Sequence, residues 1–266
     1  MRFTFSEPWR SVMTEESYDL FRSRFRRPTL FVTLTALFLL TGLAPVHILA
    51  ADCVILLHGL ARTAASMTDL EEAFIERSYV VANVDYPSRE YPIETLSEMA
   101  IEAGLDQCAQ SDHQSVHFVT HSLGGILVRY YLTEHELPRL GRVVMLAPPN
   151  QGSEVIDEFG WLPGFHLLNG PAGDQLGTRE NSVPRQLGEV TYPVGILAGT
   201  HSINWILSTA LPNPDDGKVF VESTRVEGMT DFMTLPISHP FIMSDPDAIR
   251  QTLRFIETGQ FERSGK

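Results

Sequence analysis

Residues 116–132 read VHFVTHSLGGILVRYYL, and this stretch decides the fold. Its first part, 116–120, has the pattern of a short strand, and its second part, 124–132, has the pattern of a helix. Ser122 lies between the two, and the glycines that follow it let the strand and the helix approach closely. A tight strand-to-helix turn strains the backbone of such a serine and exposes its hydroxyl. The stretch therefore predicts a nucleophilic serine at the end of a strand.

Short apolar runs alternate with helical stretches on both sides of this junction. Further strands are predicted at 54–57, 80–84, 143–146 and 194–197, and further helices from Ser66, over about 92–107 and over about 246–256. Strands that alternate with helices predict a parallel sheet with both faces covered. The predicted fold class is therefore α/β, with a mostly parallel central sheet and helices on both faces.

The N-terminal residues 1–51 are predicted to lie outside this domain. Four arginines precede an uncharged stretch, 28–51, and this order is typical of a secretory signal. We expect export to the periplasm or the medium, with cleavage after Ala50 or Ala51. The alternative is a signal anchor in which residues 29–51 stay in the membrane and the folded domain lies outside the cytoplasm. In either case residues 52–258 form the domain, and residues 259–266 form a C-terminal tail.

The composition restricts the partners. The hydrophobic content is 43% and the charged content 20%, as in globular proteins. The net charge is -13, which repels nucleic acid, and the sequence has no basic stripe and no nucleic-acid motif. No nucleic-acid partner is therefore expected. Two cysteines without a nearby histidine pair also argue against a metal site.

The serine junction resembles the nucleophile elbow of the α/β-hydrolase superfamily, in particular that of its bacterial lipases and esterases. The usual elbow is Gly-x-Ser-x-Gly, whereas residues 120–124 read THSLG, with Thr120 in the place of the first glycine. Residues 54–60 read VILLHGL and are similar to the strand and loop that carry the oxyanion hole in lipases. The resemblance implies that the backbone N–H groups of Leu60 and Leu123 form this hole.

A nucleophilic serine requires a histidine as its base. In this superfamily the base comes last in the chain order, after the serine and the acid. His135 and His201 come too early for this order, and His166 lies in an irregular stretch. His239 lies in a Ser-His-Pro loop before the last predicted helix, so it is the expected base for Ser122.

The acid is expected in the loop after the predicted strand at 194–197. Residues 213–219 read NPDDGKV and resemble a lipase segment, Asp-Gly-x-Val, in which the acid directly precedes the glycine. This alignment selects Asp216. Asp215 is the alternative, and Asp231 is a more distant one.

The stretch at about 150–193 interrupts the alternation of strands and helices, and it is rich in Gly, Pro and Asn. Insertions of this length are usually functional. We expect a cap or lid in which Trp161, Phe165 and Leu167 line an acyl pocket, and a packed cap without mobility is the alternative.

The resemblance implies a serine hydrolase that cleaves small-molecule or lipid esters through an acyl-enzyme, with no cofactor and no metal. An acyltransferase or lipid deacylase would use the same three residues. A catalytically inactive binding module is a third hypothesis, but such a module has no need of all three groups in order.

The two cysteines, Cys53 and Cys108, are expected to lie at the same edge of the sheet. Cys53 begins a predicted strand, and Cys108 ends the helix before the strand that leads to Ser122. The resemblance implies that these strands are neighbours, with both cysteines at the sheet edge away from the catalytic residues. We expect a disulfide in an oxidising compartment, and the alternative is two buried free thiols.

Overall fold

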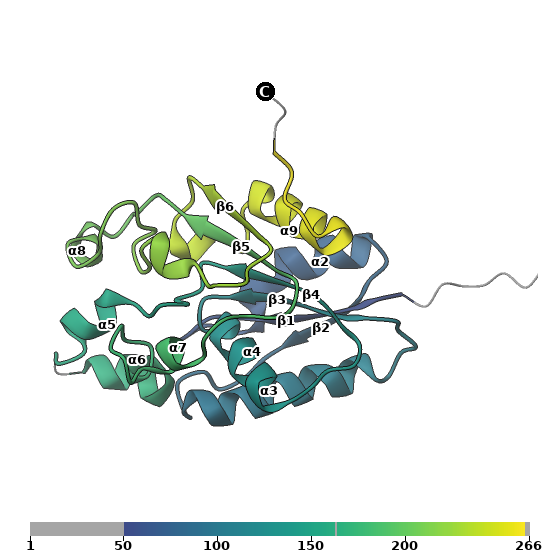
Figure 1. Ribbon diagram of the computed structural model, residues 1–266, viewed down its shortest axis with the longest axis horizontal. Coiled ribbons are helices and arrows are strands. Elements are labelled where there is room, and N and C mark those ends of the chain that lie inside the picture. The colour runs from purple at the N-terminus through teal and green to yellow at the C-terminus, as the bar shows by residue number, and fades with distance from the viewer. Residues whose placement is uncertain (1–50, 163, 264–266) are drawn as a thin grey trace, which may run out of the picture. The chain divides into compact units, whose positions relative to one another are not determined.

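The computed structural model describes residues 51–162 and 164–263, and its centre is a sheet in the order β2-β1-β3-β4-β5-β6 (Figure 1). Every neighbouring pair of strands is parallel. This arrangement confirms the predicted parallel sheet. The strands are β1 (Cys53–Leu57), β2 (Val80–Val84), β3 (Val116–His121), β4 (Leu140–Leu146), β5 (Val194–Gly199) and β6 (Asp231–Leu235).

Helices cover both faces of the sheet (Figure 1). α2 (Thr68–Glu76) and α9 (Pro246–Thr258) lie on one face, and α3 (Ile93–Cys108) and α4 (Leu123–Glu134) lie on the other. Successive side chains of a strand point to opposite faces. In β1, Ile55 therefore packs in the core with α3 and α4, whereas Leu56 packs in the core with α2 and α9.

The last strand, β6, is not among the strands that the sequence predicts. Four of its five residues are half-buried and Thr234 is exposed, because β6 is an edge strand. It therefore lacks the continuous apolar run of the central strands. The other strands occur where they are expected, with bounds that differ by no more than three residues.

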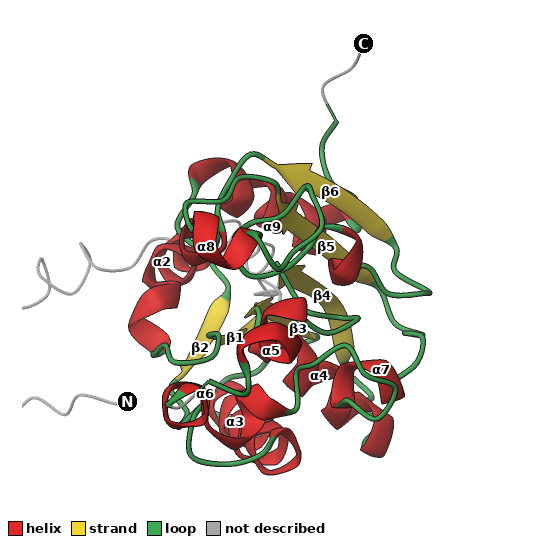
Figure 2. Cartoon of the chain, turned by 90° about the vertical axis from the view of Figure 1, so that its left-hand side faces the viewer, coloured by secondary structure: helices red, strands yellow, loops and turns green. Residues whose placement is uncertain are grey.

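The segment between β4 and β5 carries three short helices. They are α5 (Glu154–Phe159), α6 (Phe165–Asp174) and α7 (Val183–Gln186). A further short helix, α8 (Trp205–Ser208), follows β5. Figure 2 looks onto the end of the sheet where α5, α6 and α8 gather. Short 3-10 turns complete the fold: η1 (Ala64–Met67), η2 (Glu222–Thr224) and η3 (His239–Phe241).

The predicted signal or anchor, residues 1–51, lies outside the described residues except for Ala51. None of the helices that the structure describes is long and apolar enough to cross a membrane. The described part of the C-terminal tail, 259–263, packs against the domain. Phe261 is buried beside Phe255, and its N–H donates to the Asp231 carboxylate at 2.8 Å.

A disulfide joins Cys53 at the start of β1 to Cys108 at the end of α3, as expected. The Cα atoms lie 5.9 Å apart, and the two residues are 55 positions apart in the sequence. Cys53 also pairs in register with Val116 at the start of β3. The bond therefore lies at the amino ends of the strands, away from Ser122.

Replacing both cysteines by alanine should lower the free energy of unfolding by about 4 kcal/mol, because the unfolded chain regains the freedom that a closed loop of this length removes. Urea unfolding of the variant and the oxidised parent measures the difference. Peptide mapping without reductant should show one linked pair of peptides. Equal stability of the parent with and without reductant would contradict this prediction.

Candidate active site

The backbone of Ser122 is strained. Its φ is 51° and its ψ is -116°, between the end of β3 and the start of α4. Non-glycine residues rarely adopt such dihedrals, and they persist where the surrounding structure fixes them. Here the Ser122 N–H donates to the carbonyl of Leu146 at 2.9 Å, which ties the turn to the end of β4. The predicted strand–serine–helix elbow is therefore present.

Two glycines let other segments approach this elbow. A Cβ on Gly124 would lie 2.7 Å from the carbonyl oxygen of Leu57, so the first turn of α4 packs directly on the end of β1. A Cβ on Gly59 would lie 2.6 Å from Nδ1 of His121 and 3.2 Å from Cβ of Ser122. The loop after β1 is thus held against the serine with no side chain between them.

Thr120 departs from the usual elbow but does not obstruct it. The side chain is fully buried, and its hydroxyl lies 3.4 Å from the carbonyl oxygen of Val144 in β4. A Cβ on Gly125 would lie 3.3 Å from the same hydroxyl. The Thr120 side chain therefore points toward β4. The space between β4 and α4 accommodates this side chain, which a glycine at position 120 would lack.

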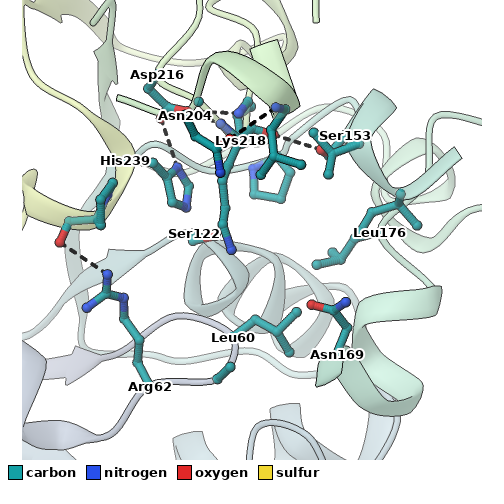
Figure 3. A pocket seen from close by; sticks show the side chains of 18 of the residues that line it. Leu60, Arg62, Ser122, Ser153, Asn169, Leu176, Asn204, Asp216, Lys218 and His239 are labelled. Carbon is teal, nitrogen blue, oxygen red and sulfur yellow. Dashed lines mark hydrogen bonds and ion pairs between the residues drawn. The ribbon is translucent and has the colours of Figure 1, made fainter. Parts of the chain in front are cut away.

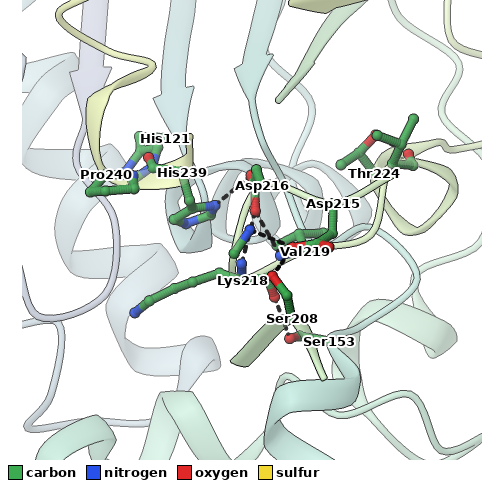
Figure 4. Close-up of polar contacts among 12 residues, drawn as sticks. His121, Ser153, Ser208, Asp215, Asp216, Lys218, Val219, Thr224, His239 and Pro240 are labelled. Carbon is green, nitrogen blue, oxygen red and sulfur yellow. Dashed lines mark hydrogen bonds and ion pairs between the residues drawn. The ribbon is translucent and has the colours of Figure 1, made fainter. Parts of the chain in front are cut away.

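The expected base and acid are paired. Nδ1 of His239 lies 2.8 Å from Oδ2 of Asp216, and both side chains are buried (Figure 4). The other carboxylate oxygen of Asp216 accepts hydrogen bonds from the backbone N–H groups of Lys218 at 2.9 Å and Val219 at 2.8 Å. Because a carboxylate accepts from Nδ1–H, the proton lies on Nδ1 and Nε2 is free to accept another.

The two alternative acids, Asp215 and Asp231, interact with groups other than His239. Asp215 is also buried, but its Oδ1 accepts from the N–H of Gly217 and the hydroxyl of Ser208, each at 2.7 Å. It therefore closes the loop that presents Asp216. Asp231 forms an ion pair with Arg263 and does not line the pocket that contains Ser122.

Ser122, His239 and Asp216 line one cavity of about 480 Å³ (Figure 3). Ser122 and His239 come from different loops and face the same space. No hydrogen bond joins their side chains in the described structure, and such bonds are often long before substrate binds. Ser122 is half-buried, so its hydroxyl can be reached from the cavity.

The proposed oxyanion donors lie beside this cavity. Leu60 lines it, and Leu123 is the first residue of α4. Within residues 51–162 and 164–263, neither backbone N–H donates a hydrogen bond to a protein acceptor. The N–H groups of a helix's first turn have no partner within the helix, and the helix dipole favours negative charge there.

Two further histidines support the site. His58 is fully buried, stacks on Tyr86 and places its Nδ1 2.8 Å from the carbonyl of Gly59, so it shapes the loop that holds Leu60. His121 donates from Nε2 to the backbone carbonyl of His239 at 3.1 Å. Burial lowers the pKa of His121 well below its usual value, and the nearby His239 lowers it further. His121 is therefore neutral at physiological pH.

The cavity wall combines apolar residues with cations. Of the three side chains expected in an acyl pocket, Phe165 lines it, whereas the exposed Trp161 and Leu167 do not. Spacing alone could not separate the three, because Trp161 lies in the turn between α5 and α6, whereas Phe165 and Leu167 of α6 line different pockets. Other apolar residues at this wall include Val155, Ile156, Leu168, Leu176, Ile203 and Leu207, and the cations are Arg62, Arg89 and Lys218. Sequence patterns did not single out these cations.

Among the residues that the structure describes, no three His, Cys, Asp or Glu side chains are grouped as a metal site would require.

Comparisons with known proteins agree with this fold. Residues 54–254 match the model of the alpha/beta hydrolase family. The mature lipase BlEst2 of Bacillus licheniformis is 20% identical with a TM-score of 0.61, over 79% of this chain and 92% of that one. The phospholipase PlaB of Legionella pneumophila is 18% identical with a TM-score of 0.63, over 78% and 60%. The metagenomic carboxyl esterase MGS0156 is 17% identical with a TM-score of 0.52, over 78% and 76%.

At these identities the solved structures establish a common fold and nothing finer. No curated protein matches the sequence.

Gly124→Ala should lower the free energy of unfolding by about 1–3 kcal/mol, because the new methyl group would meet the backbone of Leu57, which cannot move aside. Gly125→Ala is the matched control. Its Cβ would meet the side chains of Pro148 at 3.2 Å and Met145 at 3.3 Å, and both substitutions gain the same helix propensity. Urea unfolding compares the two variants. If Gly125→Ala lost more free energy of unfolding than Gly124→Ala, the contact between β1 and α4 would not be the tighter of the two, and the prediction would be wrong.

Proposed function

The chain belongs to the alpha/beta hydrolase family, and from this premise we propose that it is a serine hydrolase that cleaves carboxylic esters. The observation that carries the proposal is the buried hydrogen bond between His239 and Asp216, in the cavity that also contains the strained Ser122. A binding protein would have no use for a buried histidine–carboxylate pair in the same cavity as a strained, half-buried serine.

In the proposed reaction, Ser122 Oγ attacks the acyl carbonyl while Nε2 of His239 takes its proton. The carbonyl oxygen becomes negative and accepts hydrogen bonds from the N–H groups of Leu60 and Leu123. The C–O bond to the alcohol then breaks, and His239 returns the proton to the departing oxygen. Water hydrolyses the acyl-enzyme by the same steps, which release the acid and restore Ser122.

The charge that His239 gains in this reaction is balanced by its neighbours. The Asp216 carboxylate accepts from Nδ1 and stabilises the imidazolium. The tilted ring of His121 lies 4.8 Å from the His239 ring, centroid to centroid. Because His121 is neutral, it fixes the backbone of His239 without placing a second positive charge beside it.

The insertion supplies the proposed acyl site. Val155 and Ile156 of α5 and Phe165 of α6 line the cavity together with Leu176. The hydroxyl of Ser153, directly before α5, donates to the carbonyl of Lys218 at 2.8 Å, which ties the insertion to the loop of the acid (Figure 4). We propose that this wall holds the acyl chain of a small-molecule or lipid ester.

We also propose that the domain works after export. The Cys53–Cys108 disulfide supports this, because disulfides persist in oxidising compartments and are rare in the cytosol. The arginines before the apolar stretch at 28–51 point in the same direction.

Ser122→Ala should lower kcat for 4-nitrophenyl esters at least about 10³-fold, because the oxyanion donors retain little catalysis without a nucleophile. Labelling by a fluorophosphonate should disappear with it. Circular dichroism checks that the variant folds, and a series of acyl chain lengths on the parent defines the preferred ester. A variant with turnover near that of the parent would refute the proposed function.

Asp216→Asn should lower kcat by about 10⁴-fold, because the amide would donate to Nδ1 and force the wrong tautomer on His239. Asp215→Asn is the matched control and should cost at most a few-fold, since the amide oxygen can still accept from Gly217. Both are measured at saturating substrate. The reverse ranking would assign the acid to Asp215 and leave the enzyme class intact.

A further inference from the structure

Positive charge gathers in the active-site cavity of an acidic protein. The chain has a net charge of -13, yet three of the four charged residues that line the cavity are the cations Arg62, Arg89 and Lys218. The fourth is Asp216, whose carboxylate is occupied by His239 and by backbone N–H groups. The cavity therefore has the opposite sign of charge from the molecule as a whole.

These cations have no carboxylate partner in the described part of the chain. No Asp or Glu oxygen of those residues lies within 4.0 Å of Arg62, Arg89 or Lys218. The Arg62 guanidinium donates to the backbone carbonyl of Pro240 at 3.1 Å, directly after the base. Asp85 and Glu90 line an adjoining pocket that Arg62 and Arg89 also reach, but not the cavity that contains Ser122.

Of the three cations, Lys218 gives the clearest indication that the cavity binds an anion. Figure 3 shows its side chain extending into the cavity toward Ser122. Burial lowers the pKa of Lys218 by desolvation, and the nearby charge of Arg62 lowers it further, whereas the carboxylate of Asp216 opposes this shift. Two cations that repel each other across one cavity are stabilised when an anion binds between them.

Building on the hydrolase function proposed above, we propose that the substrate is an anionic ester, whose phosphate or carboxylate group binds to Lys218 and Arg62. The apolar wall around Phe165 takes the acyl chain, and the scissile carbonyl lies at Ser122 between the two. Hydrolysis adds one water and releases a fatty acid together with an anionic alcohol. Arg89 extends the positive charge along the cavity.

A matched set of soluble esters tests this. The three substrates are 1-octanoylglycerol-3-phosphate, the octanoyl ester of glycerate and the neutral 1-octanoylglycerol, each below its micelle concentration. The measured quantity is the ratio of kcat/KM for each anionic ester to that for the neutral one. 4-Nitrophenyl octanoate separately reports whether the protein hydrolyses esters at all.

The parent should prefer at least one anionic ester, and Lys218→Met should lower that ratio about tenfold, as expected for loss of a charged hydrogen bond. Lys218→Arg should retain most of the preference, and Arg62→Gln should lower it. Arg254→Met is the matched control, because it removes an exposed charge of α9 far from the cavity and should leave the ratio unchanged. The anionic group favoured by the parent tells phosphate from carboxylate.

A ratio that neither Lys218→Met nor Arg62→Gln changes would overturn the inference and leave the hydrolase proposal standing. So would an equal fall on all three esters, which would assign Lys218 to the chemistry rather than to anion recognition. If the parent cleaves no ester, the hydrolase proposal fails, and calorimetric titration of octyl phosphate decides the anion site by itself. Binding that Lys218→Met weakens would support the site, and no binding to the parent would refute it.

Discussion

The strained turn at Ser122 is the constraint on which the rest of the site depends. It fixes the direction of the hydroxyl, and it requires β1 and α4 to approach so closely that a methyl group on Gly124 does not fit. All the strands are parallel, so their carboxyl ends meet at one edge of the sheet. The loops after β5 and β6 therefore bring Asp216 and His239 to the same edge as the serine.

The parts of the site that could be predicted from the sequence are those that depend on chain order. Ser122, Asp216 and His239 follow one another along the chain, and a parallel sheet brings residues at strand ends together whatever their separation in sequence. Trp161 and Leu167 could not be separated from Phe165 in this way, because side-chain direction in turns and short helices depends on packing. Arg62 and Lys218 were not predicted as site residues, because neither belongs to a recognisable motif. Only the folded chain brings the two side chains to the same cavity.

The adjacent residues Asp215 and Asp216 show what the local sequence can and cannot predict. Both are buried and both accept backbone hydrogen bonds, so burial and chemistry alone do not distinguish them. The difference is direction: one carboxylate closes its own loop with Ser208, and the other reaches across to His239. The resemblance of residues 213–219 to the lipase segment predicted which of the two carboxylates reaches the histidine. The charge and hydropathy of the two residues are the same and could not predict it.

The disulfide gives the domain a property that noncovalent packing alone would not. Cys53 and Cys108 enclose α2, β2, α3 and the loop that holds Leu60 in one covalent ring. A protease that cut one bond inside this ring would release no fragment, because the disulfide would still join the two pieces at the base of the sheet. The nicked chain would therefore keep the loop that holds Leu60 linked to the rest of the domain.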